Sequence, residues 1–224
     1  MVRDPAPRDG GAAAAARDLT RPRPDHLVTF YEHASYLTAS VRPFLLAGLE
    51  RGETILVVAT AEHRTAFARA VTASGHDLEH SRRAGHYVEL DAADSLAGLL
   101  TQEGLPPARF DRRVARPVTE MAQNPQGLRV YGEMASLLWQ RGDLDLALEL
   151  EDRWNDLLRR VPMRLFCGQP LSAFDTAQTT ARFHDMCARH TVVTTDSYGS
   201  LSVTGAATDP VVMLDAGAPG GSRN

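Results

Sequence analysis

The chain has 224 residues, of which 43% are hydrophobic and 23% charged, and its formal net charge is −4. This length and composition fit one globular domain with a sizeable core, and the charge provides no basic footprint for nucleic acid. All 24 basic residues are arginine, which excludes a phosphate-loop lysine and a Schiff-base lysine. The two cysteines, Cys167 and Cys187, make no disulfide framework and favour a reducing cytoplasm.

Both ends of the chain have the composition of disordered tails. Residues 1–24 are rich in Ala, Pro, Arg and Gly, and residues 205–224 end in DAGAPGGSRN. The sequence shows neither the pattern of a signal peptide nor an apolar stretch of ~18 residues that could span a membrane. We therefore expect one domain over residues 25–204 that is cytoplasmic and contacts neither a membrane nor nucleic acid directly.

Strand and helix patterns alternate between the tails. Apolar runs predict a strand that begins at His26 and further strands at 54–59, 86–90, 128–132 and 163–168, with a last strand or hairpin within 191–203. A 3.6-residue periodicity predicts helices at 36–50, 61–74, 92–102, 107–123, 133–141, 144–160 and 172–189. This alternation predicts a three-layer α/β fold, in which helices cover both faces of a mostly parallel sheet.

The first strand leads into an unusual corner. In α/β sheets of this kind, ligands bind beyond the carboxyl ends of the strands, where the strand order reverses. Many such proteins keep a glycine-rich phosphate loop after the first strand, but here Phe30, Tyr31, Glu32 and His33 occupy that place. We expect Phe30 and Tyr31 to contribute contact area to a pocket at this edge.

The predicted helix 144–160 carries two polar residues on its apolar side. Glu151 and Asn155 lie one turn apart, among Leu144, Leu148 and Leu158. A carboxylate on a core-facing stripe must be paired, hydrogen-bonded or protonated. Two interpretations stay open: a satisfied structural network, or the lining of a pocket.

Glu133 follows the strand at 128–132 and lies in the first turn of the next helix. An acidic residue is favoured there by the helix dipole alone. The same place, at the carboxyl edge of a central strand, suits a catalytic or metal-binding acid. Both interpretations stay open.

Other polar residues have weaker signals. His26 at a strand start and Cys167 on an apolar strand are typical of buried structural side chains. His184, Cys187 and His190 share a helix face in part, but one helix cannot easily converge three ligands, so we predict no metal site. The sequence also lacks the common motifs for phosphate loops, dinucleotide binding, zinc proteases and serine hydrolases, and no catalytic residue is predicted.

The chain resembles the MEDS domain, the methanogen/methylotroph sensory domain of bacterial and archaeal signalling proteins. The landmarks that carry this resemblance run in order over about residues 25–195, and together they are more specific than any one alone. They are HLVTFYE (26–32), FLLAGLERGETILVVAT (44–60), GHYVELDA (85–92), ARFD (108–111), LRVYGEM (128–134), ELEDRWNDL (149–157), LFCG (165–168) and ARH (188–190).

The resemblance implies a RecA-like fold related to circadian-clock ATPases, with a degenerate phosphate loop. In that family, Gly52-Glu53 before the second strand is similar to a retained ATPase element, while the first corner has lost its glycines and lysine. Family members often accompany histidine-kinase, anti-sigma or DNA-binding modules. The chain is therefore expected to act as a free-standing sensor or adaptor that works with a regulatory protein of one of these types.

The leading hypothesis is a non-enzymatic sensory domain in bacterial signal transduction and transcription regulation. It would bind a small ligand of unknown identity or a regulatory protein, with no predicted cofactor; a homo-oligomer is left open. The alternatives are a residual nucleotide-binding enzyme of ATPase type, with Glu133 as base, and a pure protein-interaction adaptor. The expected ligand-binding residues are His26, Phe30, Tyr31, Glu133, Glu151, Asn155 and Cys167.

Overall fold

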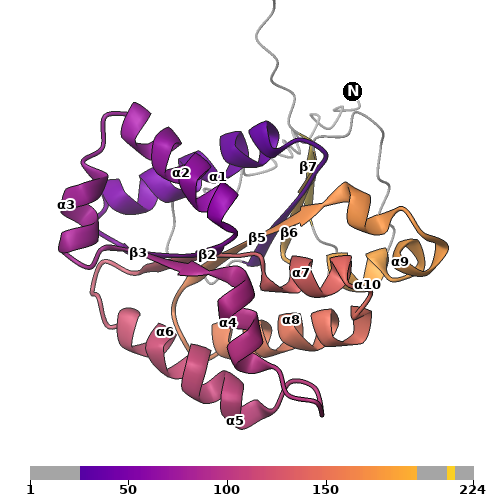
Figure 1. The fold of residues 1–224 in the computed structure, drawn as a ribbon. Coiled ribbons are helices and arrows are strands. Elements are labelled where there is room, and N and C mark those ends of the chain that lie inside the picture. Colours follow the sequence, from indigo (N-terminus) through magenta and orange to yellow (C-terminus); the bar gives the residue numbers. More distant parts are fainter. Residues whose placement is uncertain (1–25, 196–210, 215–224) are drawn as a thin grey trace, which may run out of the picture.

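The computed structural model describes residues 26–195 and 211–214, which contain a seven-stranded sheet in the order β3-β2-β4-β5-β1-β6-β7 (Figure 1). All of its strand pairs are parallel, so the predicted mostly parallel sheet is confirmed. From one edge to the other, the strands are β3 (Tyr87–Asp91), β2 (Thr54–Ala59), β4 (Leu128–Gly132), β5 (Arg164–Pro170), β1 (His26–Tyr31), β6 (Val192–Thr195) and β7 (Val211–Leu214).

Strands β1 to β6 lie where the sequence predicts strands, whereas β7 was not predicted. The predicted strand within 191–203 is β6, whereas residues 196–203 lie outside the described residues. Strand β7 falls inside the segment 205–224 that we expected to be a disordered tail. The rest of that segment, and the predicted tail 1–24, lie outside the described residues.

Helices cover both faces of the sheet, so the predicted three-layer α/β fold is confirmed and agrees with a RecA-like arrangement (Figure 1). One face carries α1 (Ala34–Glu50), α2 (Ala61–Ala73) and α3 (Leu78–Arg83). The other face carries α4 (Ala92–Leu99), α5 (Pro107–Phe110), the π-helix η1 (Asp111–Ala115), α6 (Arg116–Met121), α7 (Met134–Gln140), α8 (Leu144–Leu158), the 3-10 helix η2 (Leu171–Phe174), α9 (Ala177–Ala181) and α10 (Phe183–Cys187).

Two of the predicted helices have a different structure, and helix α3 was not predicted. The helix expected at 172–189 is three short helices, because Thr176 forms a capping box with Thr179 and starts α9 anew. The helix expected at 107–123 contains the π-turn of η1, which ends two residues before Pro117. Proline has no N–H and clashes with the preceding turn of an α-helix, and the wider π-turn accommodates it.

The buried residues form two clusters, one on each side of the sheet. Alternate strand residues point to opposite faces, so Leu27 and Tyr31 of β1 pack under α1 and α2, while Val28 and Phe30 pack toward α7 and α10. Strands β2, β4 and β5 are buried on both faces, as continuous apolar runs predict.

The direction of the connections reverses between two central strands. Strand β2 continues into α2 on one face and its neighbour β4 continues into α7 on the other, so the carboxyl ends of this pair form a switch point. Elsewhere along the carboxyl edge of the sheet, only Glu32 and His33 join β1 to α1. Two residues are too few to wrap a phosphate group.

Candidate functional site

The structure separates the expected site residues into three groups. His26, Glu151, Asn155 and Cys167 come together on the α8 side of the sheet, near the amino end of β1. Tyr31 and Glu133 lie on the opposite face, at the carboxyl edge. Phe30 is fully buried among Phe174 and Phe183, with ring centroids 5.2 and 4.8 Å away, and packs in the core.

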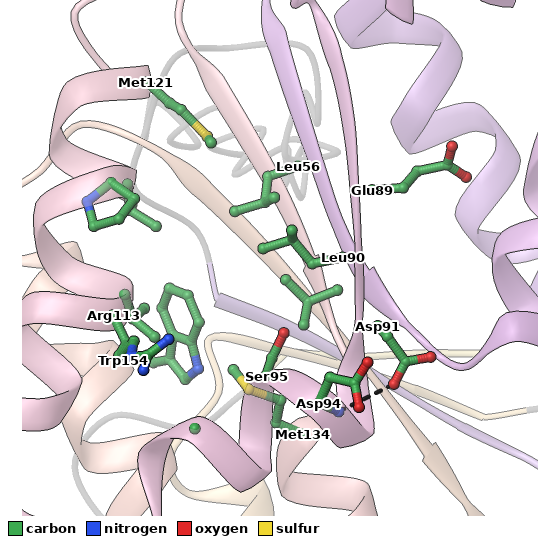
Figure 2. A pocket seen from close by; sticks show the side chains of 15 residues that line it. Leu56, Glu89, Leu90, Asp91, Asp94, Ser95, Arg113, Met121, Met134 and Trp154 are labelled. Atoms are coloured by element: carbon green, nitrogen blue, oxygen red, sulfur yellow. Dashed lines mark hydrogen bonds between the residues drawn. The ribbon is translucent and has the colours of Figure 1, made fainter.

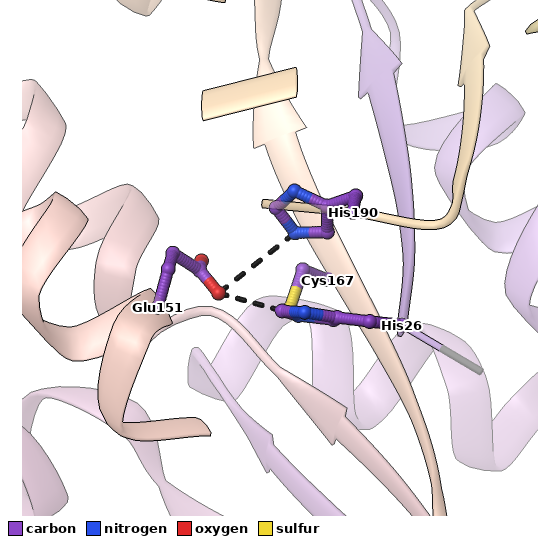
Figure 3. A group of neighbouring side chains, drawn as sticks. All are labelled: His26, Glu151, Cys167 and His190. Carbon is purple, nitrogen blue, oxygen red and sulfur yellow. Dashed lines mark hydrogen bonds and ion pairs between the residues drawn. The ribbon is translucent and has the colours of Figure 1, made fainter. Parts of the chain in front are cut away.

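The first group is completed by a residue from a distant segment. Four side chains, His26, Glu151, Cys167 and His190, offer ligand atoms that all lie within 4.8 Å of one another (Figure 3). We call them the His–Cys–Glu cluster. His26 Nε2 lies 3.2 Å from Glu151 Oε2 and 3.3 Å from Cys167 Sγ, and His190 Nε2 lies 3.8 Å from the same carboxylate oxygen. All four side chains are buried.

Hydrogen bonds from outside the cluster orient its two histidines. Asn155 Oδ1 lies 3.0 Å from His26 Nδ1, and Asn155 Nδ2 donates to the carbonyl of Arg189 at 3.0 Å. His190 Nδ1 lies 2.8 Å from the carbonyl of Met186. Asn155 therefore supports the cluster from outside, and its two bonds connect α8 to β1 and to the segment after α10.

Burial and neighbouring charges together shift the pKa values in the cluster. Burial lowers the pKa of His190 to about 3, helped by the charge of His26, and raises the pKa of the Cys167 thiol well above its usual value, helped by Glu151. For Glu151, burial alone raises the pKa, but the neighbouring His26 and His190 outweigh it and lower the pKa. The carboxylate is thus held ionised inside the protein.

The second group is a hydrogen-bonded network around Glu133 at the switch point. Tyr131 Oη donates to Glu133 Oε1 at 2.7 Å, His63 Nδ1 contacts the same oxygen, and the backbone N–H of Thr60 donates to Oε2 at 2.9 Å. Tyr31 packs edge-on against His63, with ring centroids 5.9 Å apart. Glu133 therefore connects the end of β4 to the start of α2.

Charge and burial act against each other in this network. Burial lowers the pKa of His63, but the hydrogen bond and charge of Glu133 outweigh it, and the net effect is a raised pKa. Burial and the charge of Glu133 raise the pKa of the Tyr31 and Tyr131 hydroxyls far above their usual value. Glu133 accepts from three groups at once, so it acts as an anchor for protonated partners.

A pocket opens elsewhere, between α4, the α6 region and the edge of the sheet (Figure 2). Its volume is about 400 Å³. Apolar side chains make its walls: Leu56, Val58, Leu90, Val114, Pro117, Val118, Met121, Met134 and Trp154. Asp94, Ser95 and Arg113 add polar side chains to the lining. The side chains of Glu89 and Asp91 instead point to the other face of the sheet, where they pair with Arg82 of α3 and Arg64 of α2. We call this the α4–α6 pocket.

Three features distinguish the α4–α6 pocket from a packing defect. The π-turn of η1 contributes Arg113 and Val114 to the wall, and π-turns inside helices are frequent at functional sites. Leu90, 43% exposed, is at the mouth, where an apolar side chain faces solvent. Trp154 forms the inner wall and is held edge-on by Phe110 at 5.7 Å.

A family model described as the methanogen/methylotroph, DcmR sensory domain (MEDS) matches residues 25–190. The chain belongs to the MEDS family. This confirms the resemblance found in the sequence, and because MEDS is a family of sensory domains it agrees with a role in signal sensing. Comparison with curated proteins gives no match.

The MEDS match contains every residue of the His–Cys–Glu cluster and of the α4–α6 pocket, and it ends at His190. None of the helices in the described part of the chain is long and apolar enough to cross a membrane.

Several of these residues were not expected from the sequence. His190 was considered only with His184 and Cys187, but α10 ends at Cys187, and the ring of His190 turns toward His26 instead, with centroids 4.0 Å apart. His63 has one signal, its position after a strand end. The only sequence signal for the α4–α6 pocket is Pro117 inside a predicted helix, because a pocket depends on how the helices are spaced.

Proposed function

We propose that this MEDS domain senses a small, largely apolar molecule that binds in the α4–α6 pocket and is not chemically changed there. The single observation that supports this proposal is the pocket itself, a cavity of about 400 Å³ with apolar walls and a polar margin. Pockets for small ligands are concave, mostly apolar and equipped with a few polar groups that orient the ligand.

The lining suggests how the ligand would be held. Leu56 and Leu90 of the sheet face Trp154 across the pocket, so an aliphatic or aromatic group would be buried between them (Figure 2). Arg113 and Asp94 at the margin would orient a polar end. The volume lies near the lower end of the usual range of about 300–1,000 Å³ for ligand pockets, which favours a small molecule.

The pocket also joins elements that could transmit a signal. Its lining comes from β2, β3, α4, η1, α6, α7 and α8. A ligand that draws α4 and the π-turn together would change the outer surface of these helices. A regulatory protein of the histidine-kinase, anti-sigma or transcription-factor type would then read that surface. A ligand shifts an equilibrium only by its different affinity for the two states, so this model requires tighter binding to one helix arrangement.

Small primary alcohols provide a direct test of binding. We expect n-butanol, n-pentanol and n-hexanol to shift the backbone amide resonances of the pocket residues in a two-dimensional NMR titration. Each added methylene should tighten binding by about fourfold, because burying one contributes about 0.8 kcal/mol. Affinity should level off once the alkyl chain fills the cavity.

A matched pair of variants on α4 provides the control. Ser95→Phe places a ring in the pocket, whereas Ala97→Phe adds the same ring at an exposed position of the same helix. Ser95→Phe should abolish alcohol binding and Ala97→Phe should preserve it. Equal binding by both variants, or no binding by the unaltered chain, would refute the proposal.

The enzyme alternative rests on the His63–Glu133 pair at the switch point. A base there would have to accept a proton at a carboxylate that already accepts from Tyr131, His63 and Thr60. Nucleotide hydrolysis would also need positive groups to neutralise phosphate charge, and the Glu32–His33 connection provides no lysine. Calorimetric titration with Mg-ATP, paired with a turnover assay on the chain and on Glu133→Gln, tests it; turnover that depends on Glu133 would favour the enzyme.

A further inference from the structure

The lone pairs of the ligand atoms in the His–Cys–Glu cluster point toward a common position. The carbonyl of Arg189 can only accept a hydrogen bond, so Asn155 must turn its Nδ2 toward it and its Oδ1 toward His26. His26 Nδ1 is then the donor of that contact. In the neutral ring, Nε2 therefore carries the lone pair, and it points at Glu151 and Cys167.

His190 is oriented by the same logic. Its Nδ1 faces the carbonyl of Met186, which can only accept, so Nδ1 carries the hydrogen. The lone pair of Nε2 therefore points into the cluster, 3.8 Å from Glu151 Oε2. Nε2 of His190 and both carboxylate oxygens of Glu151 make no hydrogen bond within the described part of the chain.

Such a centre is incomplete as it stands. Four electron-pair donors converge in a region where Glu151 is fully buried and Cys167, the most exposed of the four residues, is 5% exposed. Buried acceptors without a donor or cation cost free energy, so native proteins rarely keep several in one place.

The spacing of the ligand atoms fits a metal ion. Bonds of about 2.0 Å to nitrogen and oxygen and about 2.3 Å to sulfur place tetrahedral ligand atoms roughly 3.2–3.8 Å apart. Three of the six separations between the ligand atoms, 3.2, 3.3 and 3.8 Å, lie in this range, and all six are within 4.8 Å. In addition, each ligand comes from a different segment, so the four approach from different directions (Figure 3).

We propose that His26, Glu151, Cys167 and His190 bind one divalent transition-metal ion, with zinc as the best match to the donor set. Two neutral imidazoles, one carboxylate and one thiolate balance the charge of a dication, so the buried centre becomes neutral. The hydrogen bonds of Asn155 and Met186 to the outer ring nitrogens are the second-shell contacts that metal-binding histidines typically make.

The ion would be structural. Four protein ligands complete a tetrahedral shell and leave no open position for substrate or water. Through them the ion joins β1, β5, α8 and the segment that leads into β6. This inference does not depend on the α4–α6 pocket, so either proposal can fail alone.

Metal content is the first test. The full chain is expressed, freed of any affinity tag, dialysed without chelator and analysed by inductively coupled plasma mass spectrometry. We expect about one equivalent of zinc or another transition metal per chain. Cys167→Ser and Glu151→Gln should lower this content at least about tenfold. The matched control Cys187→Ser, at a buried cysteine outside the cluster, should keep it.

Cobalt(II) binding provides a second measurement, which does not depend on the metal that the chain acquires during expression. After chelation, the unaltered chain and Cys187→Ser should bind one equivalent of cobalt(II), with the intense visible bands of a four-coordinate ion and a thiolate charge-transfer band. Cys167→Ser, with its fold checked by circular dichroism, should lose the charge-transfer band. An unaltered chain that carries no metal and binds no cobalt(II), or metal content that is equal in all variants, overturns the proposal; the cluster is then a His26–Glu151 ion pair.

Discussion

At the scale of single residues, two glycines on neighbouring strands show how closely the side chains pack. A Cβ on Gly168 of β5 would overlap the hydroxyl oxygen of Tyr131 and lie 3.1 Å from Leu37, whereas a Cβ on Gly132 of β4 would meet nothing within 4 Å. Gly168 therefore makes room for the tyrosine that binds Glu133.

We expect Gly168→Ala to lower the free energy of unfolding by about 1–3 kcal/mol, because the added methyl group forces Tyr131 and Leu37 to move. Gly132→Ala is the matched control and should change stability by less than about 1 kcal/mol. Urea unfolding followed by circular dichroism measures both. Equal effects of the two variants would show that the space beside Tyr131 is not limiting.

His63 makes the stability of the Glu133 network depend on pH. Its pKa is raised in the folded protein, so the folded state holds the proton more tightly than the unfolded state does. The contribution is complete below the unfolded pKa of about 6.5 and is lost as the pH rises through the folded pKa. The stability difference between the unaltered chain and His63→Gln should therefore shrink as the pH rises above about 6.5.

Urea titrations at several pH values measure this difference. His86→Gln is the control, because His86 is exposed and lies just before β3, away from Glu133. If the His86 variant showed the same change with pH, the effect could not be assigned to the contact with Glu133.

At the scale of elements, the π-turn of η1 accommodates Pro117 in the helical segment and also shapes one wall of the α4–α6 pocket. Pro117 follows the turn and also lines the pocket. The backbone N–H of Arg116 bonds to the carbonyl of Asp111, five residues back, which widens this turn relative to an α-helix.

Replacing Pro117 with Ala should let the segment close into a regular α-helix. We expect a gain of about 1 kcal/mol in the free energy of unfolding, because alanine is favoured over proline inside a helix, and weaker binding of n-hexanol, because the wall moves. Pro107→Ala, at the first position of α5 where proline is well tolerated, should change neither quantity appreciably. Tighter hexanol binding by Pro117→Ala would contradict this role for the turn.

The sequence predicts helix and strand existence well where periodicity is strong and less well where local contacts decide. The apolar runs of β2 and β4 and the long stripe of α8 are clear because burial alone selects those residues. The break at Thr176 depends on a capping box, and helix α3 is too short for periodicity to show.

The same contrast holds for the candidate sites. Glu151 and Asn155 stand out because a polar residue on an apolar stripe needs a partner, and the structure gives them His26 and the Arg189 carbonyl. The other neighbour of Glu151, His190, is placed by the connection after α10, which sequence spacing does not specify. The α4–α6 pocket depends on the distance between helices, and no residue pattern encodes that distance directly.

At the scale of the whole molecule, the parallel sheet has a protected centre and an open edge. Strands β4 and β5 have neighbours on both sides and are covered by helices on both faces, whereas β3 pairs only with β2 within the described residues. Backbone hydrogen bonds in such a sheet should therefore open with different free energies.

Native-state hydrogen exchange measures this gradient. The amides of Val130 and Leu165 should exchange only through global unfolding, and those of Val88 and Leu90 should exchange faster through local opening of β3. Uniform protection across the sheet would contradict this order and show that β3 opens only together with the centre.

The position of β1 also has a consequence for the order in which the chain can fold during synthesis. β1 is the first described strand to leave the ribosome, but its neighbours in the sheet are β5 and β6, which are made more than 130 residues later. The strands β2, β3 and β4 can pair with one another well before that. Strand β1 must therefore remain unpaired until β5 and β6 have been made, and only then does it take its place inside the sheet.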